Sequence, residues 1–301
     1  MKRDPFAGNQ PPCPGALEPH DFMERLQCLA GAFARQRARS EGYGGDPGAG
    51  RGQEFIGYRP YRVGEDARAL DFLMLARMGK PYVRIQRSEA QAHLCVLIDT
   101  SDSMAVGPPG KWQAAAEVVA AWAHVACLAG SQVSVVHATQ GAAPRVLELH
   151  KAAQWKDFSG QLFRIQARGG ADLSELLTWR GLQQRWSQVV CVGDLFDAEP
   201  AHFEPHLRGN VPWTLVRIMA PLEIAPKASE ATLWLDPRGQ AQGRPDGGAH
   251  GHWAYLQRLA ANQEVWRKWA AMHRVSLLNH SSANAFEEVF LGAGDGLGGV
   301  L

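Results

Sequence analysis

One short apolar run constrains this chain more than any other feature. Residues 94–98 read Leu-Cys-Val-Leu-Ile and stop abruptly at the polar sequence of residues 99–103, Asp-Thr-Ser-Asp-Ser. The run contains no charge and is followed at once by a turn-like segment. That pattern is typical of a strand buried on both faces of a parallel sheet. The run therefore predicts a central strand in an α/β fold.

Strands and helices are predicted to alternate from His93 onward, which is the signature of a parallel α/β sheet. We expect one doubly wound, mostly parallel α/β domain over residues 91–292. The expected strands are 94–98, 132–137, 145–149, 188–192, 213–219, 231–235 and 275–278. The expected helices are 111–128, 152–163, 172–186, 201–207, 253–272 and 283–290. On the 253–272 helix, Trp253, Trp266 and Trp269 recur at helical spacing, so this face is predicted to lie in the core.

The composition shifts along the chain and divides it into five parts. Residues 1–20 are rich in Pro and Gly and are predicted to be disordered. Residues 21–52 are expected to form a helix and a Gly-rich linker, and residues 53–90 a small β segment rich in Arg and aromatic residues. The α/β domain of residues 91–292 follows, and residues 293–301 are expected to be a flexible tail.

The composition is that of an ordinary soluble protein. Hydrophobic residues make up 46% and charged residues 20%, and the net charge of +1 gives no general attraction to nucleic acid. The five cysteines show no C-x-x-C spacing, which favours a reducing compartment. The start of the chain has no apolar signal-peptide core, and the Ala-rich stretch at 114–129 is shorter than a membrane span requires. We therefore expect a cytoplasmic protein with no membrane span and no nucleic-acid partner.

Hard oxygen donors gather where the predicted strands end. Asp99, Ser101 and Ser103 are spaced two apart after residues 94–98, and Asp194 follows the apolar run of residues 188–192. Ligands of open α/β sheets bind at the carboxyl ends of strands. Carboxylates and hydroxyls suit Mg²⁺ or Mn²⁺ better than zinc or copper. The two strands should be neighbours, because Asp99 and Asp194 must reach one ion.

The Asp-x-Ser-x-Ser loop resembles the metal-ion-dependent adhesion site of von Willebrand factor A domains. Upstream, residues 52–61 read Gly-Gln-Glu-Phe-Ile-Gly-Tyr-Arg-Pro-Tyr, and residues 64–72 read Gly-Glu-Asp-Ala-Arg-Ala-Leu-Asp-Phe. Ala-Arg at 76–77 and Val-Arg at 83–84 follow. In this order, the segments resemble the signature of the bacterial "domain of unknown function 58" family. The resemblance extends from about residue 30 to about residue 290.

The resemblance implies a von Willebrand A-like fold whose metal ligands are Asp99, Ser101, Ser103 and Asp194. Where this family usually has a threonine ligand, the chain has Ala171, which carries no side-chain oxygen; Asp172 beside it is a further candidate ligand or a helix cap. A metal-free site is therefore an open alternative. Proteins of this family commonly accompany AAA+ ATPases of the MoxR type. The resemblance thus implies a non-enzymatic interaction module that acts with such an ATPase in chaperone-like assembly or activation of other proteins.

Two other functions remain open at this point. One is a metal-dependent hydrolase or phosphotransfer enzyme with Asp99 as nucleophile, although Ser101 stands where aspartyl-phosphate chemistry wants a second carboxylate. The chain has neither a G-x-S-x-G elbow nor a P-loop. The other is a metal-free scaffold that binds its partner through the Arg-rich segment of residues 53–90, with Arg59 and Arg62 as candidate contacts. We favour a protein that is not an enzyme, and the sequence does not fix its oligomeric state.

Overall fold

The chain divides into two compact units in a computed structural model. The model describes residues 20–40, 54–61, 71–87, 92–105, 107, 109–138, 143–167, 173–207, 209, 211–226 and 249–292. The first unit consists of residues 1–37 and 93–301, and the second of residues 38–92. The second unit is thus inserted into the sequence of the first.

The first unit is built on a six-stranded sheet with the order β5-β4-β3-β6-β7-β8. Only the β4–β5 pair is antiparallel. The order runs outward in both directions from the β3–β6 pair, which is the doubly wound arrangement predicted from the sequence. The predicted adjacency of the strands that precede Asp99 and Asp194 is confirmed. The strands are β3 (His93–Ile98), β4 (Gln132–His137), β5 (Arg145–Leu149), β6 (Gln188–Gly193), β7 (Trp213–Met219) and β8 (Ser276–Ser281).

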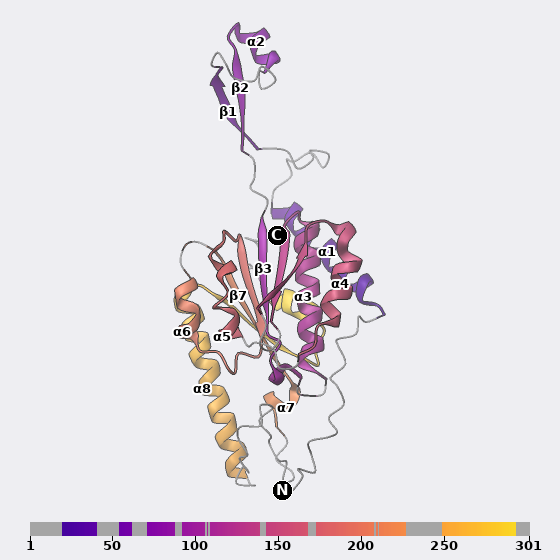
Figure 1. Ribbon diagram of the computed structural model, residues 1–301, viewed down its shortest axis with the longest axis vertical. Helices are drawn as coiled ribbons and strands as arrows, with labels where there is room; N and C mark the ends of the chain where they lie inside the picture. Colours follow the sequence, from indigo (N-terminus) through magenta and orange to yellow (C-terminus); the bar gives the residue numbers. More distant parts are fainter. Residues whose placement is uncertain are drawn as a thin grey trace. The chain divides into compact units, whose positions relative to one another are not determined.

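Helices cover both faces of this sheet (Figure 1). One face packs against α1 (Phe22–Ser40), α3 (Lys111–Leu128), α4 (Trp155–Arg164) and α9 (Glu287–Gly292). The other face packs against α5 (Leu173–Leu176), α6 (Pro200–Phe203) and α8 (Ala249–His273). Val96 and Ile98 belong to the first core and Cys95 and Leu97 to the second, which explains why β3 is apolar from Leu94 to Ile98. Short helices complete the unit: η2 (Asp102–Ala105), η3 (Ala152–Gln154), η4 (Arg180–Gln183), η5 (Glu204–His206) and α7 (Pro221–Ile224).

Helix α1 belongs to the core of the first unit although it precedes the second unit in sequence. Phe22 is fully buried and makes edge-to-face contacts with Phe163 of α4 and with Phe286 just before α9. Arg25 donates a hydrogen bond of 2.7 Å to Glu287, across 262 residues of sequence. The first described helix of the chain is therefore held by the last one.

In its described residues, the second unit contains a two-stranded antiparallel sheet and the short helix α2. Strand β1 (Glu54–Pro60) pairs with β2 (Tyr82–Arg87), and α2 (Phe72–Met78) lies between them in sequence. Asp71 caps α2 by accepting hydrogen bonds from two backbone N–H groups, and Gly79 ends the helix with a φ of 66°.

Several details of the sequence prediction differ from the structure; among them, the helix expected at 283–290 begins only at Glu287. The helix expected at 172–186 is broken into α5 and η4, because Thr178 hydrogen-bonds the carbonyl of Glu175 and the indole of Trp186 donates to the carbonyl of Gly181. The helix expected at 201–207 is likewise split into α6 and η5. Trp253 is 62% exposed, since α8 begins beyond the end of the sheet (Figure 1), whereas Trp266 and Trp269 are buried as predicted. The strand expected at 231–235 lies outside the described residues.

None of the helices in the described part of the chain combines the length and the hydropathy needed to cross a bilayer.

Candidate functional site at the ends of β3 and β6

The loop after β3 is held in a tight turn by its own polar side chains. The backbone N–H of Asp99 extends the sheet by donating to the carbonyl of Val192, at 2.9 Å. Asp99 Oδ1 accepts the N–H of Ser101 at 2.8 Å, and the hydroxyls of Ser101 and Ser103 share a hydrogen bond of 2.9 Å. These three side chains lie together, as the sequence predicted.

The loop after β6 brings Asp194 to the same end of the sheet. Gly193 allows the close approach, because a Cβ on it would lie 2.7 Å from the Cβ of Asp99 and 2.9 Å from a methyl group of Leu173. Leu195 has a φ of 59°, a left-handed conformation that costs a non-glycine residue on the order of 1–3 kcal/mol. The turn aims Asp194 inward, where Oδ1 accepts the N–H of Phe196 at 3.1 Å.

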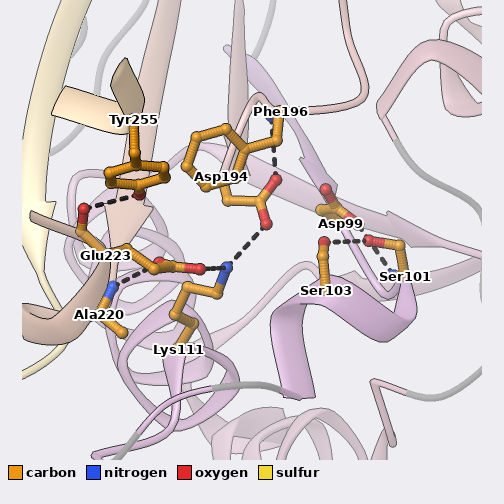
Figure 2. A network of polar contacts seen from close by, with 9 residues as sticks. All are labelled: Asp99, Ser101, Ser103, Lys111, Asp194, Phe196, Ala220, Glu223 and Tyr255. Atoms are coloured by element: carbon orange, nitrogen blue, oxygen red, sulfur yellow. Dashed lines mark hydrogen bonds and ion pairs between the residues drawn. The ribbon is translucent and has the colours of Figure 1, made fainter. Parts of the chain in front are cut away.

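Lys111, which the sequence predicts as the first residue of a helix, is buried at the centre of this site. Lys111 Nζ lies 2.8 Å from Asp194 Oδ2 and 2.7 Å from Glu223 Oε1, and its side chain is 1% exposed (Figure 2). Glu223 Oε2 accepts the N–H of Ala220 at 2.8 Å. The hydroxyl of Tyr255 on α8 donates to the carbonyl of Glu223 at 2.7 Å. One ammonium group therefore joins the start of α3, the end of β6 and helix α7.

The charges around Lys111 keep it protonated. Burial alone would lower the pKa of Lys111, but the neighbouring carboxylates of Asp194 and Glu223 raise it above the ordinary value for lysine. The Phe196 ring lies over the ammonium, with its centroid 5.4 Å from Nζ. An ammonium is the state in which Lys111 donates to both carboxylates at once.

A second buried cation, Arg217 of β7, lies beside the same loop. It pairs in register with Gly193 and stacks 5.8 Å from the centre of the Trp266 ring. Its Nε and Nη2 atoms are buried without a hydrogen-bond partner. Burial lowers the pKa of Arg217 to about 10, although the charge of Asp194 acts in the opposite direction. Asp194 thus lies in the field of two cations supplied by the protein itself.

The described residues of these two loops do not fit a tight Mg²⁺ or Mn²⁺ site. An ion bound directly to Asp194 Oδ2 at about 2.1 Å would lie within about 4.9 Å of the Lys111 ammonium, which is 2.8 Å from that oxygen. At an effective dielectric constant of about 20, their repulsion is on the order of 7 kcal/mol, which offsets much of the attraction of the carboxylates. Within the described ranges, no three His, Cys, Asp or Glu side chains are grouped so that they could hold a metal ion.

The remaining predicted site residues are not placed beside this loop pair by the structure. Ala171 and Asp172 lie outside the described residues. Arg59 belongs to β1 of the second unit, where its side chain is not described, and Arg62 lies outside the described residues as well. Their predicted roles stay predictions.

The sheet is doubly wound and mostly parallel, and its Asp-x-Ser-x-Ser loop lies where the strand order reverses, which is the arrangement that the resemblance to von Willebrand factor A domains implies. Residues 57–225, more than half of the chain, match the family described as "Protein of unknown function DUF58". The chain belongs to this family, as its sequence motifs predicted. A solved structure, that of the conserved hypothetical protein BatB from Bacteroides thetaiotaomicron, is similar over 69% of this chain and 98% of that chain, with a TM-score of 0.44 and 12% identity. None of the curated proteins compared with the chain matches it.

Proposed function

We propose that this protein is a non-enzymatic interaction module that binds a protein partner through the loops after β3 and β6. The observation that carries the proposal is the internal pairing of the buried charges. Lys111 satisfies Asp194 and Glu223, and the Asp99 carboxylate accepts the N–H of Ser101 within its own turn. Such a site is rigid and pre-organised, which favours binding. Among its described residues, no activated nucleophile is paired with a base, which hydrolysis or phosphoryl transfer would need.

Apolar side chains beside the charged cluster support a protein as the ligand. Phe196 follows Asp194 by two residues, and Leu222 and Ile224 flank Glu223 on α7. These three side chains are 40–42% exposed. Protein interfaces combine aromatic and aliphatic anchors with a polar surround, and a few such anchors supply most of the binding energy. We call Phe196, Leu222 and Ile224 the apolar rim.

Family resemblance supplies the class of partner, an AAA+ ATPase of the MoxR type. The chain has no P-loop of its own, so in such a pair the ATPase would hydrolyse the nucleotide and this protein would contribute recognition. The proposed role is chaperone-like assembly or activation of other proteins.

The proposal is tested by capture of the purified MoxR-type ATPase encoded in the same genome on the immobilised full-length chain. Phe196→Asp and Ile224→Asp should each weaken capture by about tenfold or more, because a desolvated anchor is lost and a charge is added. Val265→Asp is the matched control, since Val265 on α8 is also exposed but lies outside the rim. Equal capture by all four proteins would show that this face is not the interface.

A further inference from the structure

We propose that the Lys111 ammonium is a built-in cation that takes the place of the divalent ion expected at a site of this class, so that the site works without metal. The inference rests on the proposed function only for its consequence in partner binding. The role of Lys111 in place of the ion concerns this chain alone and does not depend on a partner.

The Lys111 ammonium lies at the end of the sheet where ligands of this fold bind. A metal ion at the end of such a sheet would join the loops that follow neighbouring strands. Lys111 joins the loop after β6 to the segment after β7, because it enters from the start of α3 and contacts Asp194 and the carboxylate of Glu223 in α7 (Figure 2). It is buried to the same degree as Asp194, so neither charge is screened by water.

Both oxygens of each of the two carboxylates already accept hydrogen bonds. Asp194 accepts hydrogen bonds on both oxygens, from Phe196 N–H and Lys111 Nζ. Glu223 also accepts on both oxygens, from Lys111 Nζ and Ala220 N–H. A divalent ion could bind either carboxylate only by displacing the Lys111 ammonium or by lying close to its positive charge.

The sequence also lacks one of the oxygen ligands that a divalent ion would use. Ala171 stands where this family usually supplies a threonine hydroxyl to the ion. The loss of this oxygen ligand and the presence of the Lys111 ammonium both weaken the binding of a divalent ion. A carboxylate of the partner then cannot bind by completing the coordination shell of a metal ion, because the site holds no ion with an open position.

The test is a titration of the full-length chain with Mn²⁺, followed by electron paramagnetic resonance of the free ion. The wild type should show no saturable binding at millimolar Mn²⁺. Lys111→Met, with its fold checked by circular dichroism, should bind Mn²⁺ about tenfold or more tightly, because the like charge is gone while Asp99 and Asp194 remain. The double variant Lys111→Met/Asp194→Asn should lose that gain. Lys156→Met, at an exposed lysine of α4, is the matched control and should behave as wild type.

Saturable Mn²⁺ binding by the wild type that Asp194→Asn abolishes would overturn the inference, and this measurement needs no lysine variant to fold. A folded Lys111→Met variant that gains no Mn²⁺ binding would overturn it too. Capture of the ATPase in the presence of EDTA separates this inference from the proposed function. Capture that survives EDTA supports both. Capture that requires Mg²⁺ even when no nucleotide is present overturns the built-in cation alone. Absence of capture under every condition refutes the proposed partner, and the Mn²⁺ titration still decides the role of Lys111.

Discussion

Replacing Lys111 with Met should be among the most damaging single changes to the stability of the first unit. The ammonium lies 2.8 Å from Asp194 and 2.7 Å from Glu223. At an effective dielectric constant of about 20, each contact is worth roughly 6 kcal/mol of Coulomb energy. Most of this offsets the cost of burying the three charges, but removing one partner leaves two carboxylates uncompensated. Breaking a buried pair in this way costs about 3–5 kcal/mol.

Urea unfolding followed by tryptophan fluorescence measures this loss selectively. All ten tryptophans lie in the first unit, so the signal does not report on residues 38–92. Lys268→Met is the control, since Lys268 forms an exposed ion pair with Glu264 and should cost less than about 1 kcal/mol. Adding Asp194→Asn to Lys111→Met should recover about 0.5–3 kcal/mol relative to the sum of the single changes. Equal midpoint shifts for Lys111→Met and Lys268→Met would refute the structural role assigned to the buried cluster.

Three further outcomes are expected. Trp266→Ala should lower the free energy of unfolding by about 3–5 kcal/mol in the same assay, whereas Trp253→Ala on the exposed start of α8 should change it by no more than about 0.5 kcal/mol. Burial lowers the pKa of three buried histidines, His124, His137 and His280. Because the unfolded chain then binds more protons, stability should fall between about pH 7 and pH 5.5, by up to about 1.4 kcal/mol per pH unit for each histidine; a flat profile would contradict this. A maleimide should modify exposed Cys28 well before Cys191, since burial raises the pKa of the Cys191 thiol. Peptide mapping measures the two rates. Equal rates would show that the core opens more readily than its packing indicates.

The strongest local patterns in the sequence predicted the sheet and the convergence of its loops. The apolar run at residues 94–98 and the Ala-rich helix after it are unambiguous signals, and the rule that parallel strands end at one edge places the loops of Asp99 and Asp194 at the same end of the sheet without any knowledge of packing. The family motifs upstream predicted the family that residues 57–225 match.

The parts of the site that the sequence reading missed depend on contacts between distant residues. Glu223 lies 112 residues after Lys111 in a four-residue helix, so no periodic pattern links them. Lys111 was visible as a charge at the start of a helix of unusually apolar composition, which was the available signal. Arg217 was visible as a charge inside the apolar strand β7, but the strand and helix that surround it come from other parts of the chain.

The contact between α1 and α9 has a consequence for synthesis of the protein on the ribosome. Arg25 and Glu287 are separated by 262 residues, and Phe22 packs against Phe286. At about 5–20 residues per second, the first helix waits on the order of tens of seconds before its last partner is made. During that interval the side chains of Phe22 and Leu26, which end fully buried, have an incomplete binding surface. The nascent chain therefore exposes the apolar face of α1 until residues 286 and 287 have been synthesised.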